Sequence, residues 1–142
     1  MQDLTLLLFG FIVIVLIIIV YSNKNQKTKR IQEADQLLHQ KKYAEAANVY
    51  FSQREWDKIA ETIIEAPPET QVILFHRLQN HLDASRIKSL FLTRGDSYIR
   101  RKERIKGATA YNYAGLPWKA AQIYILTGLD QNGIDNAIKV IE

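Results

Sequence analysis

The side chains that most often carry catalysis or bind metals are few in this sequence, and they are not spaced to act together. His76 and His81 are five residues apart, so they do not share a helix face as an i, i+4 metal pair would. The absence of cysteine excludes a thiol nucleophile, a disulfide framework and a Cys-ligated metal site. The serines lack a G-x-S-x-G setting, and no glycine-rich phosphate loop occurs. The sequence therefore predicts no enzyme activity, metal, cofactor or small-molecule substrate.

A cluster of positive charge occupies residues 100–106, where five of seven side chains are basic. These are Arg100, Arg101, Lys102, Arg104 and Lys106. On one helix, steps of about 100° would spread them around the circumference, which is typical of a solvated face. An acidic protein surface or lipid headgroups are the alternative ligands. Nucleic acid is not expected, because the cluster has no interleaved aromatic residues on which bases could stack.

The first 21 residues are almost wholly apolar and indicate a membrane anchor. Residues 4–21 carry no charge, and as a helix they would be about 27 Å long at about 1.5 Å per residue, close to a hydrocarbon core of about 30 Å. A cleaved signal peptide is the alternative, but it needs a basic start and a small-residue cleavage site, which are absent here. The sequence predicts an uncleaved transmembrane helix over residues 1–21.

The charges beside this anchor predict its orientation. Residues 22–30 form a basic juxtamembrane linker that contains no acid, and its basic residues are Lys24, Lys27, Lys29 and Arg30. The total charge is +4, but residues 31–142 carry 15 basic and 14 acidic side chains, a net of +1. The positive-inside rule therefore puts the amino terminus outside and the body in the cytoplasm. The high content of Ile, Leu and Val in residues 4–21 favours a bacterial inner membrane or a secretory-pathway membrane over the mitochondrial outer membrane.

Residues 31–142 are predicted to form one all-α domain. Apolar residues return at helical spacing, with a tight turn at Lys41 and Lys42. A break is expected at residues 93–96, which include the sequence Arg94-Gly95-Asp96, here interpreted as a helix boundary rather than an adhesion motif. Asp96 or Ser97 would cap a helix over residues 98–114. Short helices are expected over residues 118–126 and 134–141.

An internal similarity runs through this domain. The sequence Ala46-Ala47-Asn48-Val49-Tyr50 matches residues 120–124, 74 residues later. This resembles tetratricopeptide-like helical hairpins, in which a small residue lets the second helix approach and an aromatic residue four positions on closes the hairpin. The pattern departs at Arg30 and Arg104, where an aromatic residue is usual, and at Lys58 and Asn132, where proline is usual. The resemblance implies a small α-solenoid or helical-hairpin bundle.

The resemblance also implies a protein-binding groove along the first helix of each hairpin. The candidate groove residues are Asp35, Leu38, His39, Lys102, Ile105, Thr109, Asn112 and Tyr113. Two functions remain open at this point. One is a membrane-anchored adaptor or scaffold, an accessory subunit of a larger membrane complex, with exposed Trp118 or Tyr124 marking the contact. The other is a targeting receptor that binds peptides, because the layout is similar to the small import receptor of the mitochondrial outer membrane.

Overall fold

The computed structural model describes the backbone of residues 2–128 and the side chains of residues 8–128, and the regular secondary structure of this part of the chain is all α-helix. It contains seven helices: α1 (Gln2–His39), α2 (Tyr43–Gln53), α3 (Trp56–Glu65), α4 (Pro68–Gln79), α5 (Ala84–Arg100), α6 (Arg104–Tyr113) and α7 (Pro117–Leu126). The all-α class is confirmed. The helix predicted over residues 134–141 lies outside the described residues.

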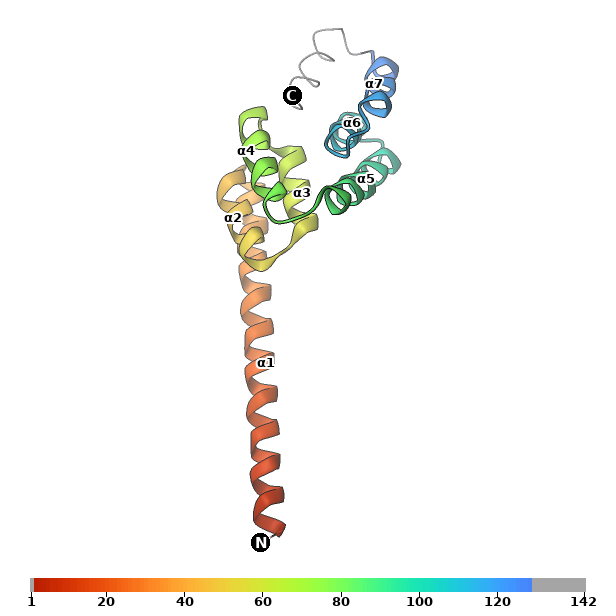
Figure 1. The fold of residues 1–142 in the computed structure, drawn as a ribbon. Helices are drawn as coiled ribbons and strands as arrows, with labels where there is room; N and C mark the ends of the chain where they lie inside the picture. The colour runs from red at the N-terminus through yellow and green to blue at the C-terminus, as the bar shows by residue number, and fades with distance from the viewer. Residues whose placement is uncertain (1, 129–142) are drawn as a thin grey trace.

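Helix α1 is one continuous helix, and its amino-terminal part extends away from the other helices, which form the body (Figure 1). Its apolar window is not covered by any part of the body, and α1 is the one described helix that is long and apolar enough to cross a membrane. Residues 22–30 continue the same helix, so the basic segment is a helical extension of the anchor and not a break in it. The last turns of α1 pack on α2 and bury Ala34 completely.

Helices α1, α2 and α3 form one three-helix unit, and α5, α6 and α7 form a second unit that repeats the first at an offset of 61 residues. Helices α5, α6 and α7 end or begin 61 residues after the corresponding points of α1, α2 and α3. The turns repeat too, because Lys41 and Lys102 both have a positive φ, as do Arg54 and Gly115. Helix α4 connects the two units. The 74-residue offset drawn from the sequence pairs α2 with α7, whereas the structure gives α2 the place that α6 has in the second unit.

Small residues set the close crossing of the first two helices in each unit. Ala34 and Ala46 are fully buried in the first unit, and Gly95 and Gly107 hold the equivalent positions in the second. A Cβ atom on Gly95 would lie 2.6 Å from the Tyr111 ring. A side chain at this position would clash with the Tyr111 ring, which explains why glycine is found here inside a helix. The break predicted at residues 93–96 is wrong, because α5 runs through these residues to Arg100.

The helix ends near this segment also differ from those predicted. Asp83 caps α5, and its carboxylate accepts a hydrogen bond of 2.9 Å from the Arg86 backbone N–H. Asp96 and Ser97 lie within α5, so neither of them caps a helix. The chain turns instead at residues 101–103, where Lys102 has a φ of 64°. By contrast, the Lys41–Lys42 turn and the helix predicted over residues 118–126 are confirmed within one residue.

Candidate functional site

A chain of ion pairs links the odd-numbered helices to one another. Lys58 on α3 lies 3.0 Å from Asp35 on α1, and Lys119 on α7 lies 3.7 Å from Asp96 on α5. Between these pairs, Arg94 on α5 reaches Asp57 at 3.4 Å and Glu61 at 3.9 Å on α3. These ion pairs join α1 to α3, α3 to α5 and α5 to α7.

A buried tyrosine completes each of the two repeated pairs. Tyr50 on α2 donates a 2.6 Å hydrogen bond to Asp35, and Tyr111 on α6 donates one of 2.6 Å to Asp96. Burial raises the pKa of Tyr50, and the Asp35 carboxylate raises it further. Burial also works to raise the pKa of Asp35, but the hydrogen bonds from Tyr50 and Lys58 outweigh it and lower that pKa below 3.8. Each triad thus ties three helices together.

The predicted groove residues of α1 do not form one exposed site. Asp35 is engaged by Tyr50 and Lys58, as described above. Leu38 is partly buried against the main hydrophobic core. His39 is exposed at the last residue of α1. Of these three, His39 alone presents its side chain fully to solvent.

The remaining predicted groove residues lie in the turn before α6 or on α6 itself, which is the middle helix of its unit. Lys102 and Ile105 are exposed. The Thr109 hydroxyl donates a hydrogen bond to the Ile105 carbonyl. Asn112 and Tyr113 are buried, with only 4% and 6% of their surface exposed. Asn112 therefore faces the core, whereas the small exposed part of Tyr113 lines a second cleft, of about 540 Å³, between α4, α5 and the end of α6.

Tyr113 has a structural role that the sequence did not indicate. Its hydroxyl donates a 3.0 Å hydrogen bond to Gln71 on α4, whose amide donates in turn to the Ala66 carbonyl at the end of α3. Its ring stacks with Phe75 and Phe91 at centroid distances of 4.7 and 5.3 Å. Tyr113 therefore joins α6 to the middle of the body.

The basic cluster at residues 100–106 is divided by the turn between α5 and α6. Lys106 binds Glu65 at 2.8 Å and Glu103 at 3.0 Å, and these hydrogen bonds raise its pKa against the effect of burial. Arg101 lies over the Tyr98 ring, 4.6 Å from its centroid, and pairs with Glu103 at 3.5 Å. Arg100, Lys102 and Arg104 have no ion-pair partner among the described residues, so the unpaired charge is confined to these three.

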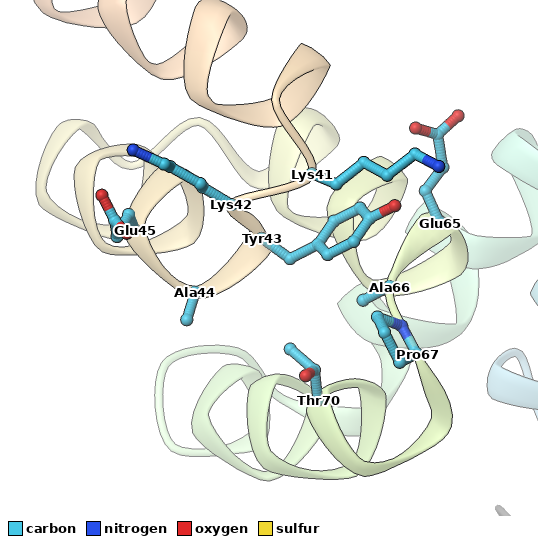
Figure 2. Close-up of a pocket in the computed structure, with 9 residues that line it drawn as sticks. All are labelled: Lys41, Lys42, Tyr43, Ala44, Glu45, Glu65, Ala66, Pro67 and Thr70. Atoms are coloured by element: carbon cyan, nitrogen blue, oxygen red, sulfur yellow. The ribbon is translucent and has the colours of Figure 1, made fainter.

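An open cleft of about 650 Å³ lies where the turn between α1 and α2 meets the turn between α3 and α4 (Figure 2). Its lining is Lys41, Lys42, Tyr43, Ala44, Glu45, Glu65, Ala66, Pro67 and Thr70. Figure 2 shows the side chains of Lys41 and Tyr43 extending toward the side of the cleft that holds Glu65. Acids and bases both line this cleft, and neither a histidine nor a serine does. Of these lining side chains, Glu65 is already paired with Lys106 at 2.8 Å.

Helix α7 presents apolar side chains to solvent. Trp118, Ile125 and Leu126 are 60%, 67% and 75% exposed, whereas Tyr124 on the same helix is 3% exposed and packs on the core of the second unit. Trp118 and Ile125 are seven residues apart and so lie on one stripe of the helix. Of the two aromatic contact markers predicted for an adaptor, Trp118 is accessible and Tyr124 is buried.

Comparisons of this chain with protein-family models, curated proteins and solved structures find no match.

Proposed function

We propose that this protein is a membrane-anchored helical-repeat adaptor, an accessory subunit that holds a protein partner in a larger membrane complex. The observation that carries the proposal is the continuity of α1, whose exposed apolar part runs without a break into the first helix of the body. The repeated units use a small residue followed four positions later by a tyrosine, as at Ala46 and Tyr50 and at Gly107 and Tyr111. This pattern supports the resemblance to tetratricopeptide-like hairpins.

A continuous helix gives the body a defined position near the bilayer. Ile31, where α1 begins to pack on the core, is ten residues past Tyr21, or about 15 Å along the axis at about 1.5 Å per residue. A body confined in this way meets membrane proteins at a raised effective concentration and with a restricted orientation. The basic flank of the anchor supports a cytoplasmic position for this body, by the positive-inside rule.

The partner surface that we propose is the exposed stripe of α7 around Trp118. Tryptophan is enriched among the residues that dominate protein interfaces, and Ile125 extends the apolar area on the same stripe. The peptide-receptor alternative has less support, because Asp35 is already engaged by Tyr50 and Lys58, and Asn112 is buried.

Purification of the full chain from its own membranes in mild detergent tests this function. We expect one stoichiometric membrane complex, which the Trp118→Ala variant loses. The matched control is Ile73→Ala, which removes an equally exposed apolar side chain from α4 and is expected to keep the complex. Many weakly bound peptides in place of one complex would favour the receptor. Release of the chain by alkaline carbonate would refute the anchor.

A further inference from the structure

The end of the body that faces the anchor is fixed against α1 by an ion pair. The turn between α2 and α3 lies at this end (Figure 1), and its Glu55 carboxylate is 2.7 Å from the Lys27 amino group on α1. Lys27 is six residues past Tyr21, which is about 9 Å along a helix that rises about 1.5 Å per residue. The turn is therefore held a short distance beyond the end of the apolar segment.

This distance is comparable to the depth of the lipid headgroups. The headgroup layer adds about 5 to 8 Å on each side of the hydrocarbon core, and the screening length at physiological salt is about 8 Å. A cation on the turn would lie within reach of the charge on an anionic leaflet. Arg54 is such a cation, because it is exposed at the turn and has no ion-pair partner among the described residues.

Neighbouring side chains make this end both basic and rigid. Phe51, Trp56 and His81 form a ring cluster with centroid distances of 5.3 to 6.4 Å, which joins the α2–α3 turn to the end of α4. The Arg77 guanidinium lies 4.3 Å from the centroid of the Phe51 ring and is exposed. The two carboxylates beside the turn are both paired, Glu55 with Lys27 and Asp57 with Arg94. We call Lys24, Arg54, Arg77 and the ring cluster the anchor-side surface.

We propose that the anchor-side surface binds the headgroups of anionic lipids and so tilts the body onto the membrane leaflet on the body's side of the bilayer. This inference rests on the membrane anchoring proposed above, and it adds a second lipid contact made by the folded body. Arg54 is the central contact, with Lys24 and Arg77 beside it. The lipid is recognised by its negative charge, so neutral lipid does not hold the body in this position.

The backbone at Arg54 offers a substitution that keeps the fold. Arg54 has a φ of 56°, a left-handed conformation that glycine adopts without strain, and Gly115 occupies the equivalent turn of the second unit. Arg54→Gly thus removes the charge and eases the backbone. Lys41→Gly is the matched control, because Lys41 has a φ of 60° and carries the same charge, but lies at the end of α1 away from the anchor. Arg54→Asn is a second neutral variant that tolerates this conformation.

The experiment measures how close the turn is to the headgroups in the full chain. The chain has no cysteine, so a single Ser52→Cys substitution carries a fluorophore at the turn, and Ala44→Cys carries it at the far end of α2. The chain is placed in nanodiscs of phosphatidylcholine, with or without about 30% phosphatidylglycerol. A small fraction of the lipids carries a nitroxide on the headgroup, and this group quenches the fluorophore.

We expect phosphatidylglycerol to increase quenching at residue 52 and not at residue 44, and we expect high salt to reverse the increase. Arg54→Gly and Arg54→Asn should lower about five-fold the ratio of chains whose body contacts the headgroups to chains whose body does not, since one interfacial charge contributes about 1 kcal/mol. Lys41→Gly should leave this ratio unchanged. Equal quenching in both lipids, or equal losses in the Arg54 and Lys41 variants, would overturn the proposal. A chain that fails to incorporate into nanodiscs would instead refute the anchor itself.

Discussion

Replacement of Gly95 by alanine tests whether the helix crossing of the second unit depends on the absence of a side chain. The new methyl group would lie 2.6 Å from Cε1 and 2.7 Å from Cδ1 of Tyr111, well inside contact distance. The ring has little room to retreat, because its hydroxyl is bonded to Asp96 at 2.6 Å and the Lys119 amino group lies 4.1 Å from its centroid. The helices must separate or this hydrogen bond must break.

Three effects set the size of the change. Overpacking of a core costs about 1–3 kcal/mol, and loss of a hydrogen bond to a charged group costs about 1.5–3 kcal/mol. Alanine is better than glycine inside a helix by about 1 kcal/mol, which offsets part of this. We expect Gly95→Ala to lower the free energy of unfolding by about 2 kcal/mol, which corresponds to a fall in the melting temperature of about 5–10 °C.

Gly107→Ala is the matched control on the facing helix. A Cβ atom there would lie 2.6 Å from Cδ1 and 2.9 Å from Cγ1 of Ile99, so Ile99 must shift, but it is a half-buried aliphatic side chain and not a ring held by a hydrogen bond, and the loss is expected to be smaller than at Gly95. We expect its stability to stay within about 1 kcal/mol of the wild type. Thermal unfolding of the full chain in mild detergent, followed by circular dichroism, measures both variants. Equal losses in the two variants, or a Gly95→Ala variant as stable as the wild type, would refute this account of the crossing.

Four further substitutions of single side chains can be checked by the same unfolding measurement. Asp83→Ala should cost about 1 kcal/mol, because it removes the cap of α5, and an unchanged stability would contradict that role. Tyr98→Phe should be neutral or stabilising, since its buried hydroxyl has no hydrogen-bond partner among the described residues and burial raises its pKa to about 12, whereas Tyr113→Phe should cost about 1 kcal/mol by removing a buried hydrogen bond. The lowered pKa of Asp35 adds stability above about pH 3.8, and this stability is lost as the pH falls through the folded-state pKa. Asp35→Asn should therefore lose less free energy of unfolding than the wild type between pH 5 and pH 2. Parallel pH profiles of the two proteins would contradict this.

The sequence predicted the features that depend on local composition and spacing. A run of apolar residues too long and too uniform for a soluble helix identifies the exposed part of α1, and the spacing of apolar residues after Arg30 identifies the all-α class. The Lys41–Lys42 turn and the start of α7 near Pro117 follow from residues that end or begin helices wherever they occur. Each of these signals acts through the few residues around it.

The features that depend on contacts between residues far apart in the sequence could be found only from the tertiary structure. Gly95 is a helix breaker by intrinsic preference, yet it lies inside α5 because the Tyr111 ring occupies the space a side chain would need. The helix bounds give a repeat of 61 residues, whereas the sequence placed it at 74, because one short alanine-rich match outweighed widely spaced equivalences such as Asp35 with Asp96. Asn112 and Tyr113 were expected in a groove and are buried, since the face that a helix turns inward is chosen by its neighbours and not by its own sequence.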